Sequence, residues 1–335
     1  MTLLILTTKN SQIDEKTVNF NQKYLKNMKI TSKVKKILAC YESDNAGTKT
    51  NLARILMHGK LAGTGKMVIL PVDQGFEHGP DRSFAVNPEA YDPHYHFQLA
   101  IDAGLNAYAA PLGMIEAGAD TFAGAIPTIL KVNSSNSLHN GGTAPHQATT
   151  ASVQDALRLG CSAIGFTIYP GSDAAFDMFE EIREMAEEAK ACGLAVVIWS
   201  YPRGGDLSKI GETAMDICAY AAHMAALLGA HIIKVKLPTQ ALENLEAIKV
   251  YEKANIPITT LEQRVAHVMK TTFNNKRIVV FSGGGSKDDA SLYNEVREIY
   301  KGGANGSIIG RNTFQRPREE ALKMLDNIVK IYQGK

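Results

Sequence analysis

The feature that most constrains the fold is a recurring pair of signals, in which a helical pattern stops at a glycine and a short apolar run follows within a few residues. Glycine supplies the left-handed residue on which many helices end, and a brief run rich in β-branched residues is typical of a strand buried on both faces. The five glycines are Gly104, Gly160, Gly193, Gly229 and Gly303, and the runs after them are 106–109, 163–168, 195–199, 232–236 and 307–310. The pairing predicts strands that alternate with helices.

Three further apolar runs, 67–72, 127–132 and 277–281, have the same strand character, so the five and the three together give eight expected strands. Eight strands alternating with helices predict an α/β protein of the (β/α)8 TIM-barrel class, which commonly uses about 250 residues as one domain. An open doubly wound sheet is the competing architecture, but no G-x-G-x-x-G motif follows the first strand. We therefore expect the barrel.

Helix-start signals lie where the helices of such a barrel are expected to begin. Asp92 precedes a proline that suits the first position of a helix. Ser152 with Asp155, and Ser286 with Asp289, have the spacing of capping boxes. These signals support the alternation of strands and helices.

The chain is expected to divide at residue 66. Residues 67–335 contain all the expected strands and are assigned to the barrel, the catalytic domain, whereas residues 1–66 are assigned to a mostly helical N-terminal extension. Lysines between Lys23 and Lys36 alternate with apolar residues at helical spacing, which predicts a helix with a solvated basic face. We expect this helix to pack on the barrel or on a neighbouring subunit.

Composition excludes several classes of protein. Lys and Arg number 36 against 34 Asp and Glu, and a net charge of +2 gives no field strong enough to suggest a nucleic-acid partner. The four cysteines are widely spaced and form no C-x-x-C pair, which fits reduced thiols. The apolar start at residues 3–6 is too short for a secretion signal, and nowhere do eighteen apolar residues run together. We expect a cytoplasmic protein that binds neither nucleic acid nor membrane.

The carboxyl ends of the expected strands are unusually polar, and in barrel enzymes this end carries the catalytic groups. The first strand ends at Asp73, the third at Lys131, the fifth at Trp199 and Tyr201, and the sixth at Lys234 and Lys236. Removing a charge from water is costly unless the charge is paired, so buried lysines and aspartates at these positions indicate a functional site.

The sixth expected strand, HIIKVK, carries the sharpest chemical signal. Lys234 and Lys236 share one face of the strand because side chains alternate with a period of two. A like charge and apolar surroundings both disfavour protonation, so one of the two lysines should have the lowered pKa that an amine nucleophile needs. A lysine paired with a carboxylate such as Asp73 is the structural alternative, and the strand alone leaves both interpretations open.

Glycine-rich backbone follows the last two strands, in FSGGGSKDD and IIGRN. In a barrel the loops after strands seven and eight often build a phosphate site. Glycines 283–285 let the backbone N–H groups approach an anion closely, and Arg311 adds a fixed cation. Together the two loops predict a phosphorylated substrate.

The motifs ILPVDQGFEHGP, ILKVN, GFTIYPGS, VVIWSYPRGG, GAHIIKVK, VVFSGGGS and SIIGRN occur in this order from residue 67 onward. In these motifs the chain resembles the archaeal-type (DhnA-type) class I fructose-bisphosphate aldolases. The resemblance implies a carbon–carbon lyase that cleaves fructose 1,6-bisphosphate reversibly into dihydroxyacetone phosphate and glyceraldehyde 3-phosphate, in glycolysis or gluconeogenesis. It implies a Schiff base in place of a metal, no cofactor, and a homo-oligomer.

Matching the motifs residue by residue, the resemblance places Lys234 at the Schiff-base position, Tyr201 at the general acid/base position, and Asp73 near the reacting carbons. His78 and Trp199 match substrate-lining positions. The polar strand ends and the glycine loops complete the expected substrate-binding set with Lys131, Lys236, Ser282, Gly283, Gly284, Gly310 and Arg311. One departure is Gln74, which stands where some archaeal members have histidine.

Two other functions remain open on the sequence. A related lysine-dependent aldolase, transaldolase or thiolase could use the same barrel and lysine on another phosphorylated ketone. A noncatalytic barrel could instead bind a phosphometabolite and use its lysines only to hold anions. The first alternative differs from fructose-bisphosphate cleavage in substrate, and the second differs in lacking an imine.

Overall fold

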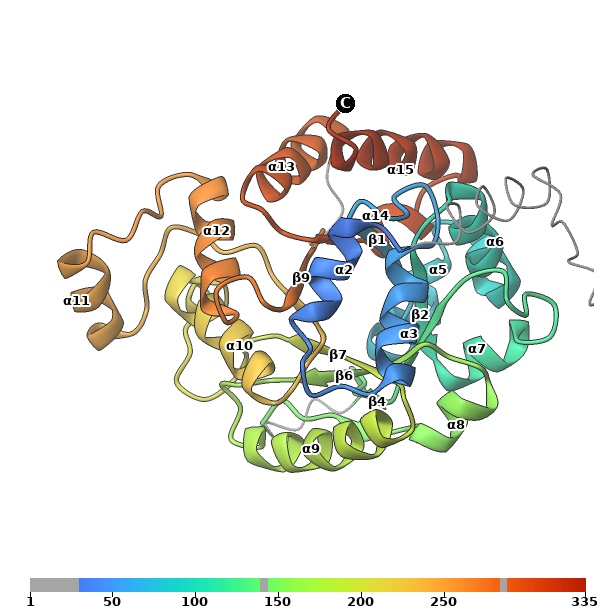
Figure 1. The fold of residues 1–335 in the computed structure, drawn as a ribbon, viewed down its shortest axis with the longest axis horizontal. Coiled ribbons are helices and arrows are strands. Elements are labelled where there is room, and N and C mark those ends of the chain that lie inside the picture. The colour runs from blue at the N-terminus through green and yellow to red at the C-terminus, as the bar shows by residue number, and fades with distance from the viewer. Residues whose placement is uncertain (1–29, 139–143, 284–287) are drawn as a thin grey trace, which may run out of the picture.

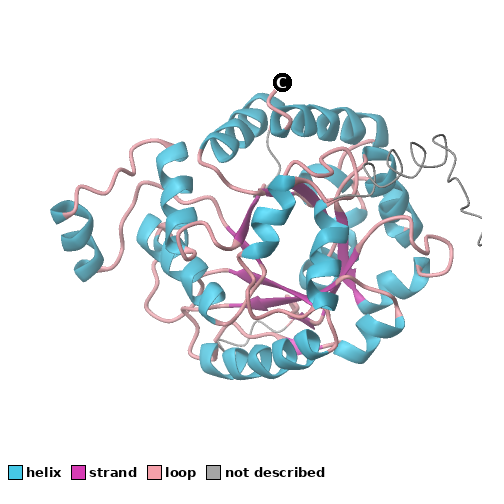
Figure 2. Ribbon diagram, viewed as in Figure 1, coloured by secondary structure: helices cyan, strands magenta, loops and turns pink. Residues whose placement is uncertain are grey.

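The computed structural model describes residues 30–138, 144–283 and 288–335. Eight parallel strands close into a barrel in the order β1-β10-β9-β8-β7-β6-β3-β2, and helices surround the ring of strands (Figure 2). The strands are β1 Met67–Pro71, β2 Ala107–Pro111, β3 Thr128–Lys131, β6 Ala163–Ile168, β7 Ala195–Ser200, β8 Ile232–Val235, β9 Ile278–Ser282 and β10 Gly306–Ile308. The (β/α)8 prediction and its eight strands are confirmed.

The helical layer follows the strands around the barrel (Figure 1). Its α-helices are α4 Gln74–His78, α5 Pro80–Phe84, α6 Pro93–Ala103, α7 Leu112–Gly118, α8 Val153–Arg158, α9 Ala175–Ala191, α10 Met215–Leu227, α11 Leu245–Lys253, α12 Leu261–Thr271, α13 Asp289–Lys301, α14 Arg311–Phe314 and α15 Arg318–Tyr332. Short 3-10 turns, η1 Pro88–Tyr91 and η2 Gly211–Thr213, and a small hairpin, β4 Asn133–Ser134 with β5 Ala148–Thr149, lie in the loops. In Figure 1, α11 projects away from the barrel.

Strand residues divide by alternation between two cores. One set packs outward against the helices, and the other fills the barrel interior, with members such as Ile69, Val197, Ile232 and Val280. All are fully buried, as expected of parallel strands covered on both sides. Toward the carboxyl ends of the strands, polar side chains replace these aliphatic ones in the barrel interior.

Two helices from the start of the described chain, α2 Ser32–Ala39 and α3 Ala46–Leu56, cross the amino end of the barrel (Figure 1). Val34 and Leu52 join the interior core. Tyr41, in the connection between the two helices, donates a hydrogen bond to the carbonyl of His231 (2.6 Å) and accepts one from the amide of Ile278 (3.1 Å). The helices thus close the amino end of the barrel and add to its core.

Local sequence signals explain most boundaries. All five helix-ending glycines have positive φ, from 64° at Gly160 to 87° at Gly303. Asp92 caps α6, and Ser152 with Asp155 forms the expected capping box of α8. The capping box expected at Ser286 with Asp289 lies partly outside the described residues, and among those described Asp288 caps α13 by accepting from the amide of Ser291 (2.9 Å).

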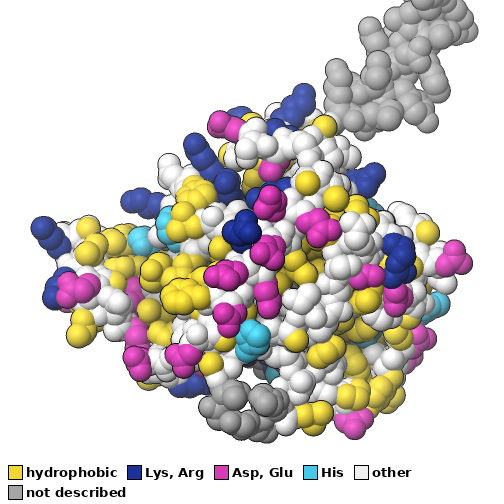
Figure 3. All heavy atoms as spheres, turned by 90° about the horizontal axis from the view of Figure 1, so that it is seen from below, with side chains coloured by type: hydrophobic (Ala, Val, Ile, Leu, Met, Phe, Trp, Pro, Cys, Tyr) yellow, Lys and Arg dark blue, Asp and Glu magenta, His cyan; other side chains and the backbone are white. Residues whose placement is uncertain are grey.

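The basic helix expected between Lys23 and Lys36 lies partly outside the described residues. Its described part begins at Thr31, whose hydroxyl caps α2. The lysines of α2 are exposed. Several Lys and Arg side chains lie on the upper part of the surface in Figure 3. No helix in the described ranges combines the length and apolarity needed to cross a lipid bilayer.

Candidate active site

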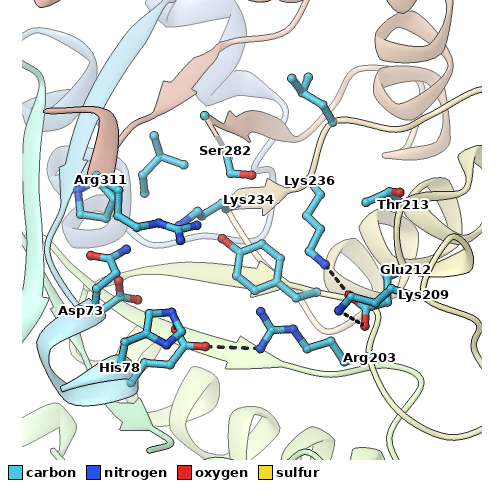
Figure 4. Close-up of a pocket in the computed structure, with 18 residues that line it drawn as sticks. Asp73, His78, Arg203, Lys209, Glu212, Thr213, Lys234, Lys236, Ser282 and Arg311 are labelled. Carbon is cyan, nitrogen blue, oxygen red and sulfur yellow. Dashed lines mark hydrogen bonds and ion pairs between the residues drawn. The ribbon is translucent and has the colours of Figure 1, made fainter. Parts of the chain in front are cut away.

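A cavity of about 440 Å³ opens at the carboxyl ends of the barrel strands (Figure 4). Charged and polar side chains from five strand ends and their loops reach into it. They are Asp73, Gln74, Glu77, His78, Tyr201, Arg203, Lys209, Glu212, Thr213, Lys234, Lys236, Ser282 and Arg311. The structure therefore brings nine of the twelve expected site residues to one cavity, including both glycines Gly283 and Gly310.

Lys234 lies at the floor of this cavity. It is 5% exposed, and its ammonium has no hydrogen-bond or ion-pair partner among the described residues. Its Nζ lies 5.6 Å from the ring centre of Trp199 and 5.4 Å from that of Tyr201. Burial, helped by the nearby Arg311 charge, lowers the pKa of Lys234 from 10.5 to about 8, against the opposing effect of two carboxylates. At this position the neutral amine is readily populated.

Trp199 supports the floor from within the barrel. It pairs in register with Lys234 on the neighbouring strand and is 1% exposed, so it lies beneath the cavity and does not line it. A side chain at Gly165, on the next strand, would place its Cβ 2.0 Å from the indole. The glycine is therefore required for the indole to lie across the barrel under the amine.

Lys131 is the second buried lysine, and its surroundings differ from those of Lys234. Its Nζ contacts the backbone and side-chain oxygens of Asn133 and the side-chain oxygen of Gln147. Burial lowers the pKa of Lys131 to about 8, but three acceptors stabilise its charged form. We therefore assign Lys131 as a fixed cation. It lines a small cavity that shares Asp73 and Tyr201 with the main one.

Tyr201 follows β7 and stands between the two lysine-bearing strand ends. Burial raises the pKa of its phenol well above 10, and the carboxylates of Asp73 and Glu77 raise it further. The Arg203 guanidinium lies 6.0 Å from the ring and opposes this shift. Tyr201 is consequently a neutral phenol that can donate a proton.

The acidic side of the cavity comes from α4, which directly follows β1. Asp73 occupies the N-cap position of this short helix, and Glu77 lies one turn later. Glu77 forms an ion pair with Arg203 (3.3 Å), and His78 lies 4.0 Å from the same carboxylate. The first and fifth barrel strands are thus linked across the cavity by a carboxylate and a guanidinium.

The opposite wall is formed by the ends of β9 and β10. Ser282 and Gly283 follow one strand, and Gly310 and Arg311 follow the other. A Cβ at Gly310 would lie 2.7 Å from the carbonyl oxygen of Pro71, so only glycine fits there. These loops present backbone and a guanidinium to the cavity. Gly284 lies outside the described residues.

Lys236 does not act on Lys234 as expected. Its ammonium forms an ion pair with Glu212 (2.9 Å), and the like charge that lowers the pKa of Lys234 comes from Arg311. The partner Glu212 belongs to η2, in the loop after β7. The expectation of two repelling lysines is wrong because the second one turns toward this carboxylate.

Two carboxylates in the cavity were not anticipated from the sequence. Glu77 lies within the motif VDQGFEHGP, yet nothing in its spacing distinguishes it from a surface glutamate. Glu212 lies in a loop without a recognisable motif. Both are partners of cations from other strands, and such pairing depends on loop geometry that one-dimensional patterns do not contain.

The closed parallel barrel and the polar cavity at its carboxyl ends define a (β/α)8 barrel enzyme. The chain belongs to the DeoC/LacD family of aldolases, whose family model matches residues 67–316. It is 37% identical over 271 residues to the fructose-bisphosphate aldolase class 1 of Thermoproteus tenax, covering 81% of this chain and 90% of that protein. It is 34% identical to a probable fructose-bisphosphate aldolase class 1 of Chlamydia muridarum, over 87% of this chain and 86% of that one.

Among solved structures, the chain is similar to an archaeal fructose-1,6-bisphosphate aldolase whose catalytic lysine is covalently bound to the carbinolamine intermediate of the substrate. The two share 34% sequence identity with a TM-score of 0.68, over 80% of this chain and 94% of that one. These likenesses confirm the family expected from the motifs and extend it to the three-dimensional fold.

Proposed function

We propose that this chain is a class I fructose-bisphosphate aldolase, which forms a Schiff base through Lys234 and cleaves a phosphorylated sugar without a metal. The observation that carries the proposal is the contrast between the two buried lysines. Lys131 has three oxygen acceptors, whereas Lys234 has no polar partner among the described residues and faces the main cavity. The names of the relatives support the same reaction.

The lowered pKa makes Lys234 the nucleophile. A shift from 10.5 to about 8 raises the neutral fraction at pH 7 from about 1 in 3000 to about 1 in 10. The amine adds to the C2 ketone to give a carbinolamine, and loss of water gives a protonated iminium. When the C3–C4 bond breaks, its electron pair moves into the iminium and forms an enamine.

Tyr201 moves the protons. Because it is a phenol at rest, it first donates its proton to the departing carbinolamine hydroxyl. The resulting phenolate, close to the cationic iminium, then accepts the C4 hydroxyl proton as the aldehyde forms. The regenerated phenol protonates C3 of the enamine, and water releases the ketone from Lys234. The Asp73 carboxylate is close enough to raise the pKa of both Tyr201 and Lys234. It therefore stabilises a cation at Lys234 and disfavours a phenolate at Tyr201.

The two ends of the cavity suit two phosphate groups. Arg311 lies at one end, while Lys209 and Lys236, which both pair with Glu212, lie at the other, with Lys234 between them (Figure 4). The backbone of Gly283 and Gly310 also lines the cavity. Guanidinium, ammonium and backbone N–H groups are the donors that phosphate prefers in proteins. A bisphosphorylated sugar would place its central carbons beside the amine.

Borohydride reduction tests the proposal. In the presence of dihydroxyacetone phosphate, borohydride should reduce the imine to a stable amine, and peptide mass spectrometry should find the adduct on the peptide that contains Lys234. Lys234→Met should lose both the adduct and the turnover. An active enzyme that shows no adduct would contradict the mechanism.

A substrate comparison separates the proposal from its nearest alternative. Turnover of fructose 1,6-bisphosphate should exceed that of fructose 1-phosphate at equal subsaturating concentrations, because the second substrate lacks a group for one cationic end. Equal rates would favour a lysine-dependent aldolase for another phosphorylated ketone. Binding without any turnover would indicate a phosphometabolite-binding barrel.

A further inference from the structure

A second cavity, of about 400 Å³, lies at the opposite end of the barrel, beside the amino ends of β8 and β9. Its walls come from the α2–α3 connection, the end of α9, the turn before β8 and the turn between α12 and β9. The side chains that define its chemistry are Asp44, Lys190, His231, Lys276 and Arg277. Nothing in the proposed aldolase reaction uses this cavity.

Three of its lining residues, Lys190, Lys276 and Arg277, carry positive charge. Among the described residues, none of the three forms an ion pair with a carboxylate. The cavity also contains Asp44, and Glu42 lies exposed at its edge, so cations outnumber carboxylates three to two. Asp44 is already occupied, because it accepts a hydrogen bond from His231 Nε2 (2.8 Å).

The His231 tautomer keeps Asp44 engaged. His231 Nδ1 accepts from the amide of Val196 (2.8 Å), so the ring proton lies on Nε2 and points at the carboxylate. Burial lowers the pKa of His231, which therefore remains neutral. Asp44 is thus held by a neutral donor and pairs with none of the three cations, although its charge partly offsets that of Lys190.

Arg277 is held rigidly with donors to spare. Its guanidinium packs between the rings of Tyr41 (5.2 Å) and Phe273 (4.9 Å). Nη1 donates to the carbonyls of Lys276 and Cys40. Nε is buried and has no partner, and Nη2 has none among the described residues. An unpaired buried donor is costly in a folded protein and indicates a missing acceptor.

The turn that places Phe273 on Arg277 is strained. Phe273, Asn274 and Asn275 have φ of 60°, 54° and 66°, three consecutive residues in the left-handed region that side chains other than glycine disfavour. Such strain persists where the surrounding structure enforces it, and it is concentrated at ligand sites. Here it fixes the aromatic wall beside the guanidinium.

We propose that this cavity binds a small oxyanion metabolite, carrying a phosphate or carboxylate group, through Arg277, Lys190 and Lys276. A planar guanidinium with free donors matches the paired oxygens of such a group, and two lysines on separate elements surround it. The volume of about 400 Å³, close to that of the catalytic cavity, suits a small metabolite. The site is independent of the catalytic cavity.

Titration calorimetry on the full chain at fixed ionic strength tests the site, with inorganic phosphate and malonate as separate probes. The double variant Lys190→Gln/Lys276→Gln should weaken one binding event by about tenfold or more, the effect of losing a charge-assisted contact. Its turnover of fructose 1,6-bisphosphate without added anion should be unchanged. Lys35→Gln, on the exposed face of α2 outside the cavity, is the matched control.

Arg277→Lys keeps the charge and removes the planar guanidinium, so it should also weaken anion binding at this cavity. Thermal unfolding of the variant verifies that it folds. Binding of phosphate alone would identify a phosphorylated ligand, and binding of malonate alone a carboxylate. Equal affinities in wild type, the double variant and Lys35→Gln would overturn the proposal, as would the failure of both probes to bind. Neither result depends on Schiff-base formation.

Discussion

Lys131 and Lys234 lie against the same indole: their Nζ atoms are 5.8 Å and 5.6 Å from the ring centre of Trp199. The strands that carry them are not neighbours in the barrel. The indole therefore links two buried amines that differ in their oxygen acceptors and in the cavity that each one lines, and we assign one as cation and the other as nucleophile on this difference.

Lys131→Met separates these two roles. The variant should still form the borohydride adduct on Lys234, because the nucleophile and its burial remain. Its turnover should fall by about tenfold or more, since a buried cation near the reacting carbons is lost. Adduct mass and turnover measured on one preparation check this, and loss of the adduct would contradict the assignment.

The pH dependence should reveal the lowered pKa of Lys234. The reactive form is the neutral amine, so kcat/KM for cleavage should rise as the pH increases toward about 8 and level off above it. A lysine with its ordinary pKa would give a rise that continues past pH 10. Borohydride trapping rates over the same range should follow the same curve, because they report the amine directly.

Tyr201→Phe should lower kcat by about a hundredfold or more, the usual contribution of a positioned acid/base group. The aromatic ring remains, and the hydroxyl has no hydrogen-bond partner among the described residues, so the unfolding temperature should change little. Rapid-quench measurement of the cleavage step checks the rate. A near wild-type kcat would show that another group transfers the proton, and Asp73 would be the first residue to test.

Gly165→Ala should damage the floor of the site. The added methyl group overlaps the indole of Trp199 and forces it to move, so both the unfolding temperature and the turnover should fall. Gly113→Ala is the matched control, because its Cβ meets nothing within 4 Å. Equal effects of the two substitutions would show that the indole position is unimportant.

Tyr41→Phe tests how the N-terminal helices are attached. It removes hydrogen bonds to His231 and from Ile278 and should lower the free energy of unfolding by about 1 kcal/mol. Turnover should remain unchanged, since the hydroxyl lies at the far end of the barrel. Tyr220→Phe, with a side chain exposed on α10, controls for loss of a hydroxyl alone.

The sequence predicted the strands well because their local signals are strong. For five of the eight strands, a glycine with positive φ ends the preceding helix and an apolar run follows closely. The other three were visible as apolar runs alone. The lysines of the site were equally visible, since Lys131 and Lys234 interrupt runs that are otherwise apolar. Charges in such runs are costly, and that cost distinguishes them from surface lysines.

The partners of the charged residues could not be predicted in the same way. Lys236 was expected to repel Lys234, but Glu212 from a different loop neutralises it. Likewise, the cap of α13 among the described residues is Asp288, which reaches the amide of Ser291 and which the sequence did not single out. In both cases the outcome depends on how a loop folds in space.

The attachment of Tyr41 has a consequence for how the chain reaches this structure. Its two hydrogen-bond partners are 190 and 237 residues away in sequence, so the segment made early in synthesis meets strands made much later. Contacts of such long range slow folding, because the chain loses entropy before they form. During translation, the apolar faces of α2 and α3 therefore stay uncovered until the strands that they contact have been synthesised.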